Sequence, residues 1–392
     1  MTDKEKLKDY IMNGAKGPLE LSKNREYSDR ADLKKINLTE ANLSNLELQN
    51  CDFSESELSH ANFDNSDLSG SIFTNSKIEA ASFTKTKLYD TYLNKLDLRK
   101  SFFTNSKLKN TCLDESKLNN SNFDYSTIRS IFISNAKLSG STFRHAKIAK
   151  TDFVNNPMIN CDFSFSIIEA SEFNDCNFTN ASFNNTTIID CKFSDSQFKS
   201  VSFKKSTLTN CKIDIFSYDD EDDDLPIISN SDFSESIVSG IDFINQNFIN
   251  VDFSLAKLHN LSFMGSKFKS VNFTSALLTK TNFKESILDS ANMTNANLEN
   301  SVLIRANLTF ANLSGANLRN SNLTLCNLTG ANLAGANLRN TKLISANLSN
   351  AFLRGADLRG ADMSGVKIKG ADFTGAKMSF LNKMRIKLKK WG

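Results

Sequence analysis

The chain has 392 residues, of which 40% are hydrophobic and 23% are charged, and its formal net charge is +3. This balance excludes a strongly acidic or strongly basic protein, and no run approaches the roughly 18 apolar residues of a membrane-spanning helix. Residues 1–30 lack the apolar core of a signal peptide, so we expect a cytoplasmic location and cysteines that stay reduced.

The N-terminal segment, residues 1–30, lies outside the regular pattern that follows it. The stretch from Thr2 to Lys6 predicts the start of a short helix, with Leu7, Tyr10 and Ile11 on one face. We interpret this segment as a cap, because the first turn of a repeat array would otherwise expose a bare sheet edge.

From Leu33 onward the chain repeats with a period of five residues. The central position, called i here, holds mainly Leu, Phe or Ile at numbers that end in 3 or 8; i−2 is small and i−1 is often Asn or Asp. A period of five fits neither a helix nor a flat strand. It fits a corner, in which i−2 and i point inward and i+1 and i+2 turn the chain. All twelve glycines from Gly70 to Gly375 fall at i+2, where a positive φ favours glycine.

The central residues also vary with a period of twenty. One series is nearly all Phe: Leu43, Phe63, Phe83, Phe103, Phe123, Phe143, Phe163, Phe183 and Phe203. Another is aliphatic: Leu48, Leu68, Leu88, Leu108, Ile128, Ile148, Ile168 and Ile188. The two remaining series repeat this contrast, which predicts a square coil of about twenty residues whose sides alternate between bulky and slimmer side chains.

The sequence resembles the pentapeptide-repeat family, whose consensus is Ala, Asp or Asn, Leu or Phe, and two variable residues. Pieces such as Ala316-Asn317-Leu318-Arg319-Asn320 carry the resemblance, which extends over about residues 31–378. It implies an all-β fold, a right-handed quadrilateral β-helix. The residues themselves predict the square coil, whereas the handedness comes from the resemblance alone.

Residues 214–230 interrupt the repeat between its two arrays, residues 31–213 and 231–378. The interruption holds the acidic run Asp219, Asp220, Glu221, Asp222, Asp223 and Asp224. Asp223 falls where neighbouring coils have Phe, so this segment is either one distorted coil or a loop of ten extra residues. We expect a solvated acidic loop and no metal site, because the EF-hand pattern is absent.

The array 231–378 is the more regular, and it carries Arg319, Arg339 and Arg359 at i+1 on one wall. Residues 379–392 then leave the repeat. Their apolar side chains have helical spacing and their cations include Lys387, Lys389 and Lys390, which predicts a basic amphipathic C-terminal cap. The alternatives are a contact with an anionic surface and a homodimer contact, the latter favoured by the family resemblance.

Catalytic motifs are missing from the sequence. His60, His145 and His259 all fall at outward positions far apart in the chain, and no CxxC, HExxH or Gly-rich phosphate loop occurs. A filled square core also leaves no room for a small-molecule substrate. We therefore predict no catalytic residue, no cofactor, no metal and no enzymatic activity.

The leading functional hypothesis is a scaffold that binds a macromolecule, most simply a protein, through its flat walls. One version of this hypothesis is a bacterial effector that is exported and binds a host target. The candidate contact residues are the acidic run, the three arginines and the C-terminal lysines named above. The alternative, implied by the family resemblance, is a DNA mimic that binds or protects a type II topoisomerase such as gyrase. Such mimicry needs a strong negative potential, which this composition lacks. Aromatic residues are expected to face inward, which argues against nucleic acid as a partner.

Overall fold

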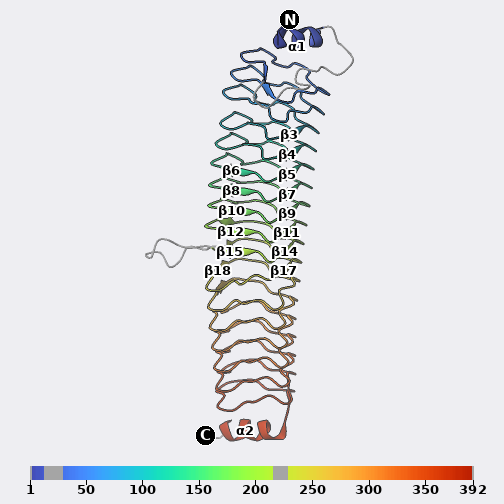
Figure 1. Ribbon diagram of the computed structural model, residues 1–392. Coiled ribbons are helices and arrows are strands. Elements are labelled where there is room, and N and C mark those ends of the chain that lie inside the picture. Colours follow the sequence, from blue (N-terminus) through green and yellow to red (C-terminus); the bar gives the residue numbers. More distant parts are fainter. Residues whose placement is uncertain (1, 13–29, 215–227, 391–392) are drawn as a thin grey trace, which may run out of the picture. The chain divides into compact units, whose positions relative to one another are not determined.

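The computed structural model describes residues 2–12, 30–214 and 228–390. These residues form a β-helix of short parallel strands joined by tight turns, with one helix before the first described coil and one after the last (Figure 1). The chain divides into two compact units, one ending at Gln197 and also including Asp214, the other beginning at Phe198. Each unit is described by itself.

In the first unit, strands twenty residues apart pair in parallel and in register. The pairs build three sheets within this unit: β1-β2, β3-β4-β5-β7-β9-β11 and β6-β8-β10-β12 (Figure 1). The elements are α1 (Asp3–Met12), β1 (Ala31–Asp32), β2 (Cys51–Asp52), β3 (Lys87–Tyr89), β4 (Lys107–Lys109), β5 (Thr127–Arg129), β6 (Phe132–Ser134), β7 (Lys147–Ala149), β8 (Asp152–Val154), β9 (Ile167–Glu169), β10 (Glu172–Asn174), β11 (Thr187–Ile189) and β12 (Lys192–Ser194).

The second unit continues the same parallel pairing, in the orders β13-β16-β18-β19, β14-β17 and β20-β21. Its elements are β13 (Phe198–Lys199), β14 (Thr207–Thr209), β16 (Ile228–Ser229), β17 (Ile237–Ser239), β18 (Asn247–Ile249), β19 (Lys267–Lys269), β20 (Asp357–Leu358), β21 (Lys377–Met378) and α2 (Phe380–Lys390), while β15 (Lys212–Asp214) ends on the residue that belongs to the first unit. Between β19 and β20 the ladder consists of single bridges such as Asn297 with Asn317.

The register changes once, around the acidic interruption. Phe198 pairs with Ile228 and Thr207 with Ile237, thirty positions apart, whereas Ile228 pairs with Phe248 at the usual twenty. Ten extra residues therefore lie between β15 and β16, which corresponds to the looped-out alternative. The acidic run Asp219–Asp224 itself lies outside the described residues.

The buried central residues stack on their copies in the next coil. In the first unit the rings of Phe103 and Phe123 are parallel to within 2°, with centroids 4.6 Å apart, and Phe123 stacks on Phe143 at 4.9 Å. A separate column holds Phe153 and Phe173, also 4.9 Å apart. The predicted alternation of Phe-rich and aliphatic sides is confirmed in this unit.

Position i−2 holds a small side chain, and position i−1 often holds an amide or a carboxylate. Polar side chains at both positions form hydrogen bonds with backbone N–H or C=O groups. At i−2, the buried hydroxyl of Ser66 donates to the carbonyl of Leu43 at 2.7 Å and accepts the N–H of Leu46 at 3.0 Å. At i−1, the Asp52 carboxylate accepts the N–H of Ser54 at 3.0 Å. These bonds hold the short turns in place between coils.

Position i+2 has a positive φ at every residue from Lys35 to Asn210 and from Asn230 to Gly375. Glycine suits this conformation, but most coils use other residues, often Asn, which tolerates it. Tyr125 and Phe165 adopt it too, at φ of 61° and 63°. For a residue with a Cβ the cost is about 1–2 kcal/mol.

Helix α1 has a reciprocal N-terminal capping box. Thr2 donates its N–H to the Glu5 carboxylate at 2.7 Å, and Glu5 donates its N–H to the Thr2 hydroxyl at 3.2 Å. Leu7 is fully buried, and the carboxylate of Asp3 accepts the N–H of Asp32 in β1 at 3.3 Å. The predicted N-terminal helix is therefore present and contacts the first coil.

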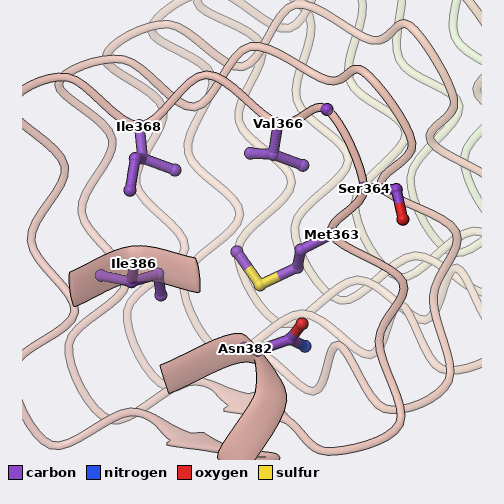
Figure 2. Close-up of a pocket in the computed structure, with 7 residues that line it drawn as sticks. Met363, Ser364, Val366, Ile368, Asn382 and Ile386 are labelled. Atoms are coloured by element: carbon purple, nitrogen blue, oxygen red, sulfur yellow. The ribbon is translucent and has the colours of Figure 1, made fainter. Parts of the chain in front are cut away.

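Helix α2 contacts the last coils through one narrow face. Asn382 donates its amide to the carbonyl of Ala361 at 2.8 Å, and Ile386 is buried. Figure 2 shows both side chains near Met363. The three residues line a crevice of about 210 Å³, which is smaller than the roughly 300–1,000 Å³ typical of ligand sites. The exposed apolar side chains Phe380, Leu381 and Met384 do not make this contact.

Candidate partner-binding surfaces

The histidines and cysteines are scattered through the described coils. His60, His145 and His259 are exposed on separate coils, and within the described ranges no three metal-ligating side chains gather. All seven cysteines are free thiols, and burial raises the pKa of Cys161 and Cys176 to about 12. No helix of the described chain is both long and apolar enough to cross a bilayer.

The three predicted arginines share one wall of the second unit, but two of them are neutralised there. Arg319 forms an ion pair with Glu299 at 3.4 Å. The Arg359 guanidinium donates two hydrogen bonds to the Asp357 carboxylate, at 2.9 and 2.6 Å. These bonds lower the pKa of Asp357 to about 2. Arg339 forms no ion pair with a described residue. The basic stripe is therefore weaker than its sequence suggests.

The other predicted contact residues are only partly described. Lys387, Lys389 and Lys390 lie in α2 by their backbone, while their side chains fall outside the described part of the structure. The acidic run is outside it altogether.

A stronger basic surface lies in the first unit, on the sheet that contains β4, β5 and β7. Lys107, Lys109, Arg129 and Lys147, here called the basic wall, all point outward and are exposed. Lys109 and Arg129 are direct ladder neighbours, and Lys107 and Lys147 both pair with Thr127. None of the four forms an ion pair with a residue in the described ranges, whereas Lys87 on β3 pairs with Asp67 at 3.0 Å.

A column of stacked rings runs along the corner beside the basic wall. Tyr125 and His145 have centroids 4.7 Å apart, and His145 and Phe165 are 5.0 Å apart, all nearly parallel. Tyr125 is 55% exposed and Phe165 is 46% exposed. Each ring of this outer ring column lies two residues before an outward residue of β5, β7 or β9, so the column borders the basic wall.

The wall that follows in the chain carries a second apolar column at i−1, formed by Ile72, Tyr92, Cys112 and Phe132. Bridges join Ile72 to Tyr92 and Tyr92 to Cys112, so these neighbours lie on adjacent coils. Tyr92 is 40% exposed and Phe132 is 55% exposed.

The expectation that the aromatic residues face inward is therefore wrong for these rings. Positions i−1 and i+2 point outward whatever residue occupies them, and a Phe or Tyr placed there is carried to the surface. The sequence signal for both columns and for the Lys109–Arg129 pair is the twenty-residue period of the i−1, i+1 and i+2 series.

Comparison with known proteins gives the chain its family. The family model for pentapeptide repeats matches eight times, at residues 36–75, 51–90, 157–195, 176–213, 227–263, 266–304, 306–343 and 341–379. A model for a pentapeptide repeat region matches residues 76–153. No curated protein sequence matches the chain.

Solved structures of such proteins are similar to parts of the chain. HetL, a pentapeptide repeat protein involved in heterocyst differentiation regulation in the cyanobacterium Nostoc, is 24% identical over 60% of this chain and 90% of its own, with a TM-score of 0.35. A pentapeptide repeat protein from the Arabidopsis thaliana thylakoid lumen is 30% identical over 30% of this chain and 71% of its own, with a TM-score of 0.22. QnrB1, a plasmid-mediated fluoroquinolone resistance protein, is 17% identical over 63% of this chain and 98% of its own, with a TM-score of 0.20. Because the family models cover most of its length, the chain belongs to the pentapeptide-repeat family.

Proposed function

We propose that this chain is a non-enzymatic scaffold that binds a protein partner through the walls of its first unit. The observation that carries the proposal is the outer ring column. Neighbouring coils place Asn105 and Asn185 at the same corner, so the fold itself does not require rings there.

Every i+2 corner has a positive φ, and the ring column forgoes the relief that Asn gives on the flanking coils. Tyr125, His145 and Phe165 each adopt a positive φ, at about 1–2 kcal/mol apiece. Stacking contributes about 0.5–1.5 kcal/mol per ring pair, which offsets only part of that cost. Exposed aromatic side chains are enriched in protein interfaces, where they often dominate binding energy. Binding is therefore the simplest reason for the rings to be there.

The apolar column adds contact area on the same unit. Within a single coil the chain passes from Tyr125 through β5 to Phe132, so one partner can touch both columns across the basic wall. Contiguous exposed apolar side chains of this kind mark interaction sites more often than they serve the fold.

The test is quantitative affinity capture with the full chain, comparing wild type with Y125N/F165N. Asn is the residue that adjacent coils use at this corner, so the fold should tolerate the change. The matched control is F310N/L325N, which replaces two exposed i+2 side chains of the second unit. We expect a stoichiometric protein that wild type and control retain and that Y125N/F165N loses by about tenfold or more. Recovery of no such protein, or equal recovery by all three, would refute the proposal.

The gyrase-mimic alternative receives less support. A phosphate mimic needs a continuous negative surface, whereas the basic wall presents four cations without ion-pair partners among the described residues. We therefore expect two negative results in a gyrase supercoiling assay. The protein should not inhibit supercoiling, and it should not protect gyrase from an added quinolone.

We also propose that a second copy of the chain covers the apolar face of α2. Phe380 is 78% exposed, and Leu381 and Met384 are exposed beside it, while the opposite face contacts the last coils. Light scattering coupled to size exclusion should report a dimer for the wild type and a monomer for F380D/M384D. A monomeric wild type at micromolar concentration would end this proposal.

A further inference from the structure

We infer that the basic wall is the docking site for an acidic segment of the protein partner, presented as carboxylates spaced along one face of a helix. This inference rests on the proposed function, since it names the chemistry that the partner must bring to the surface beside the outer ring column.

The basic wall is electrostatically unfavourable as it stands. Lys109 and Arg129 lie directly opposite each other in the ladder, an arrangement in which like charges destabilise a sheet. Several other cations of this unit pair with a carboxylate across one coil, as in Lys77 with Glu57 at 2.7 Å and Lys117 with Asp97 at 3.3 Å. Carboxylates supplied from outside would complete the basic wall in the same way.

The size of the basic wall fits a short acidic segment. Parallel strands lie about 4.8 Å apart, so the wall extends roughly 10 Å along the ladder, from β4 to β7. Alternate residues of one strand are about 6.6 Å apart. Carboxylates three or four residues apart on a helix are separated by about 5–6 Å, which lets successive turns meet successive cations.

The outer ring column strengthens the preference for an anion. Both faces of the His145 ring are covered by Tyr125 and Phe165, so the column offers mainly ring edges. Ring edges carry partial positive charge and attract carboxylates. Ile167, 39% exposed at the end of the wall, provides an apolar contact for the flank of the same helix.

Nucleic acid fits this surface less well. Single-stranded nucleic acid binds by stacking bases on open ring faces, which the column largely occupies with its own rings. A duplex is typically held by a longer track of about 6–10 phosphate contacts. This wall has only four cations, and on the next strand, β9, the exposed carboxylate of Glu169 would repel a phosphate.

The experiment uses the full chain and measures fluorescence anisotropy of a labelled helical peptide of about 20 residues, with Glu at i and i+4 and Leu on the adjoining stripe. The comparison probes are the same peptide with Gln for Glu, and single-stranded and duplex oligonucleotides. The charge-reversal variant is K107E/K109E/R129E/K147E. Its matched control, K257E/K267E/K269E/K280E, reverses four exposed lysines of the second unit and changes net charge equally.

We expect the Glu peptide to bind wild type and control alike, and the charge-reversal variant to bind it at least about tenfold more weakly. The Gln peptide should bind weakly, added salt should reduce binding of the Glu peptide, and K107R/K109R/K147R should bind like wild type. Equal losses in the variant and its control, no binding of the Glu peptide to wild type, or tighter binding of either oligonucleotide would overturn the inference. Circular dichroism melts verify that both reversed variants fold.

The two proposals fail differently. If Y125N/F165N loses the captured protein while the charge-reversal variant keeps it, the scaffold proposal stands and the acidic-segment inference falls. If both variants keep the captured protein, both proposals fall.

Discussion

The first unit and the most regular part of the second, residues 291–360, build the same coil from different residues. In the first unit stacked Phe rings fill the core and buried Ser and Thr hydroxyls bond to the preceding coil. In residues 291–360 the core is mostly Leu and Ala, and the outward Asn residues at i−1 bond to one another. There the walls are engaged in internal ladders. In the first unit the four cations of the basic wall form no ion pair with a described residue, and they belong to the surface that we propose for binding.

The core comparison gives the largest expected effect. Phe123→Ala removes a ring stacked on both sides and should lower the free energy of unfolding by about 3–5 kcal/mol. Leu318→Ala, in the Leu core, should cost about 2–5 kcal/mol and less than Phe123→Ala, because it removes fewer buried atoms. Urea denaturation of both variants tests this, and a larger loss for the Leu variant would mean that the two cores do not differ as described.

The wall comparison should give a smaller difference. Asn317 donates its amide to Asn297 at 3.0 Å, accepts that of Asn337 at 2.9 Å, and accepts the N–H of Arg319 at 3.3 Å. Asn317→Ala should therefore cost about 1–2 kcal/mol. Thr127→Ala, on the basic wall, should change stability by less than about 0.5 kcal/mol. Equal effects in urea melts would contradict the distinction between internally bonded and available walls.

The corners provide a third test. A Cβ at Gly335 would meet no atom within 4 Å, so Gly335→Ala isolates the backbone cost of a positive φ. We expect a loss of about 1 kcal/mol by thermal or urea unfolding. Gly335→Asn should cost less, since Asn tolerates this conformation. A stability equal to wild type for the Ala variant would remove the strain argument for the outer ring column.

The smallest effect concerns pH. Hydrogen bonds from Arg359 lower the pKa of Asp357 from its ordinary 3.8 to about 2. Because the folded-state pKa is depressed, this contribution is present above pH 4 and is lost as the pH falls from about 4 through about 2. In acid titrations of stability, Asp357→Asn should flatten that part of the curve slightly. An unchanged curve would show that this exposed pair contributes nothing measurable.

The square coil could be predicted because each central residue packs on the central residue twenty positions away. Residues that contact each other therefore recur at a fixed spacing in the sequence. The two alternatives at the interruption could not be separated, because both restore the five-residue phase at Ile228. The register decided between them, with Phe203 stacked on Phe233 at 4.7 Å.

The surfaces were predicted less completely than the core. For α2 the helical periodicity predicts an apolar face, but it does not tell whether that face contacts the last coils or points away from them. The hydrogen bond from the Asn382 amide to the Ala361 carbonyl determines which face makes the contact. The twenty-residue spacing places the three arginines on one wall, but the ion pairs of Arg319 with Glu299 and of Arg359 with Asp357 depend on side-chain conformations that the spacing does not determine. The outer rings had a readable periodicity at positions that the core does not use.

The register shift at the interruption says how this molecule can lengthen or shorten. Ten additional residues are half a circuit, and the described strands on either side of the interruption pair thirty positions apart, so that Phe203 still stacks on Phe233. Deleting a single pentapeptide would rotate everything downstream by a quarter turn and set bulky rings against aliphatic neighbours. Removing four together would leave each side aligned with itself. Natural length variants should therefore differ by whole circuits, or carry their surplus as an excursion from a corner.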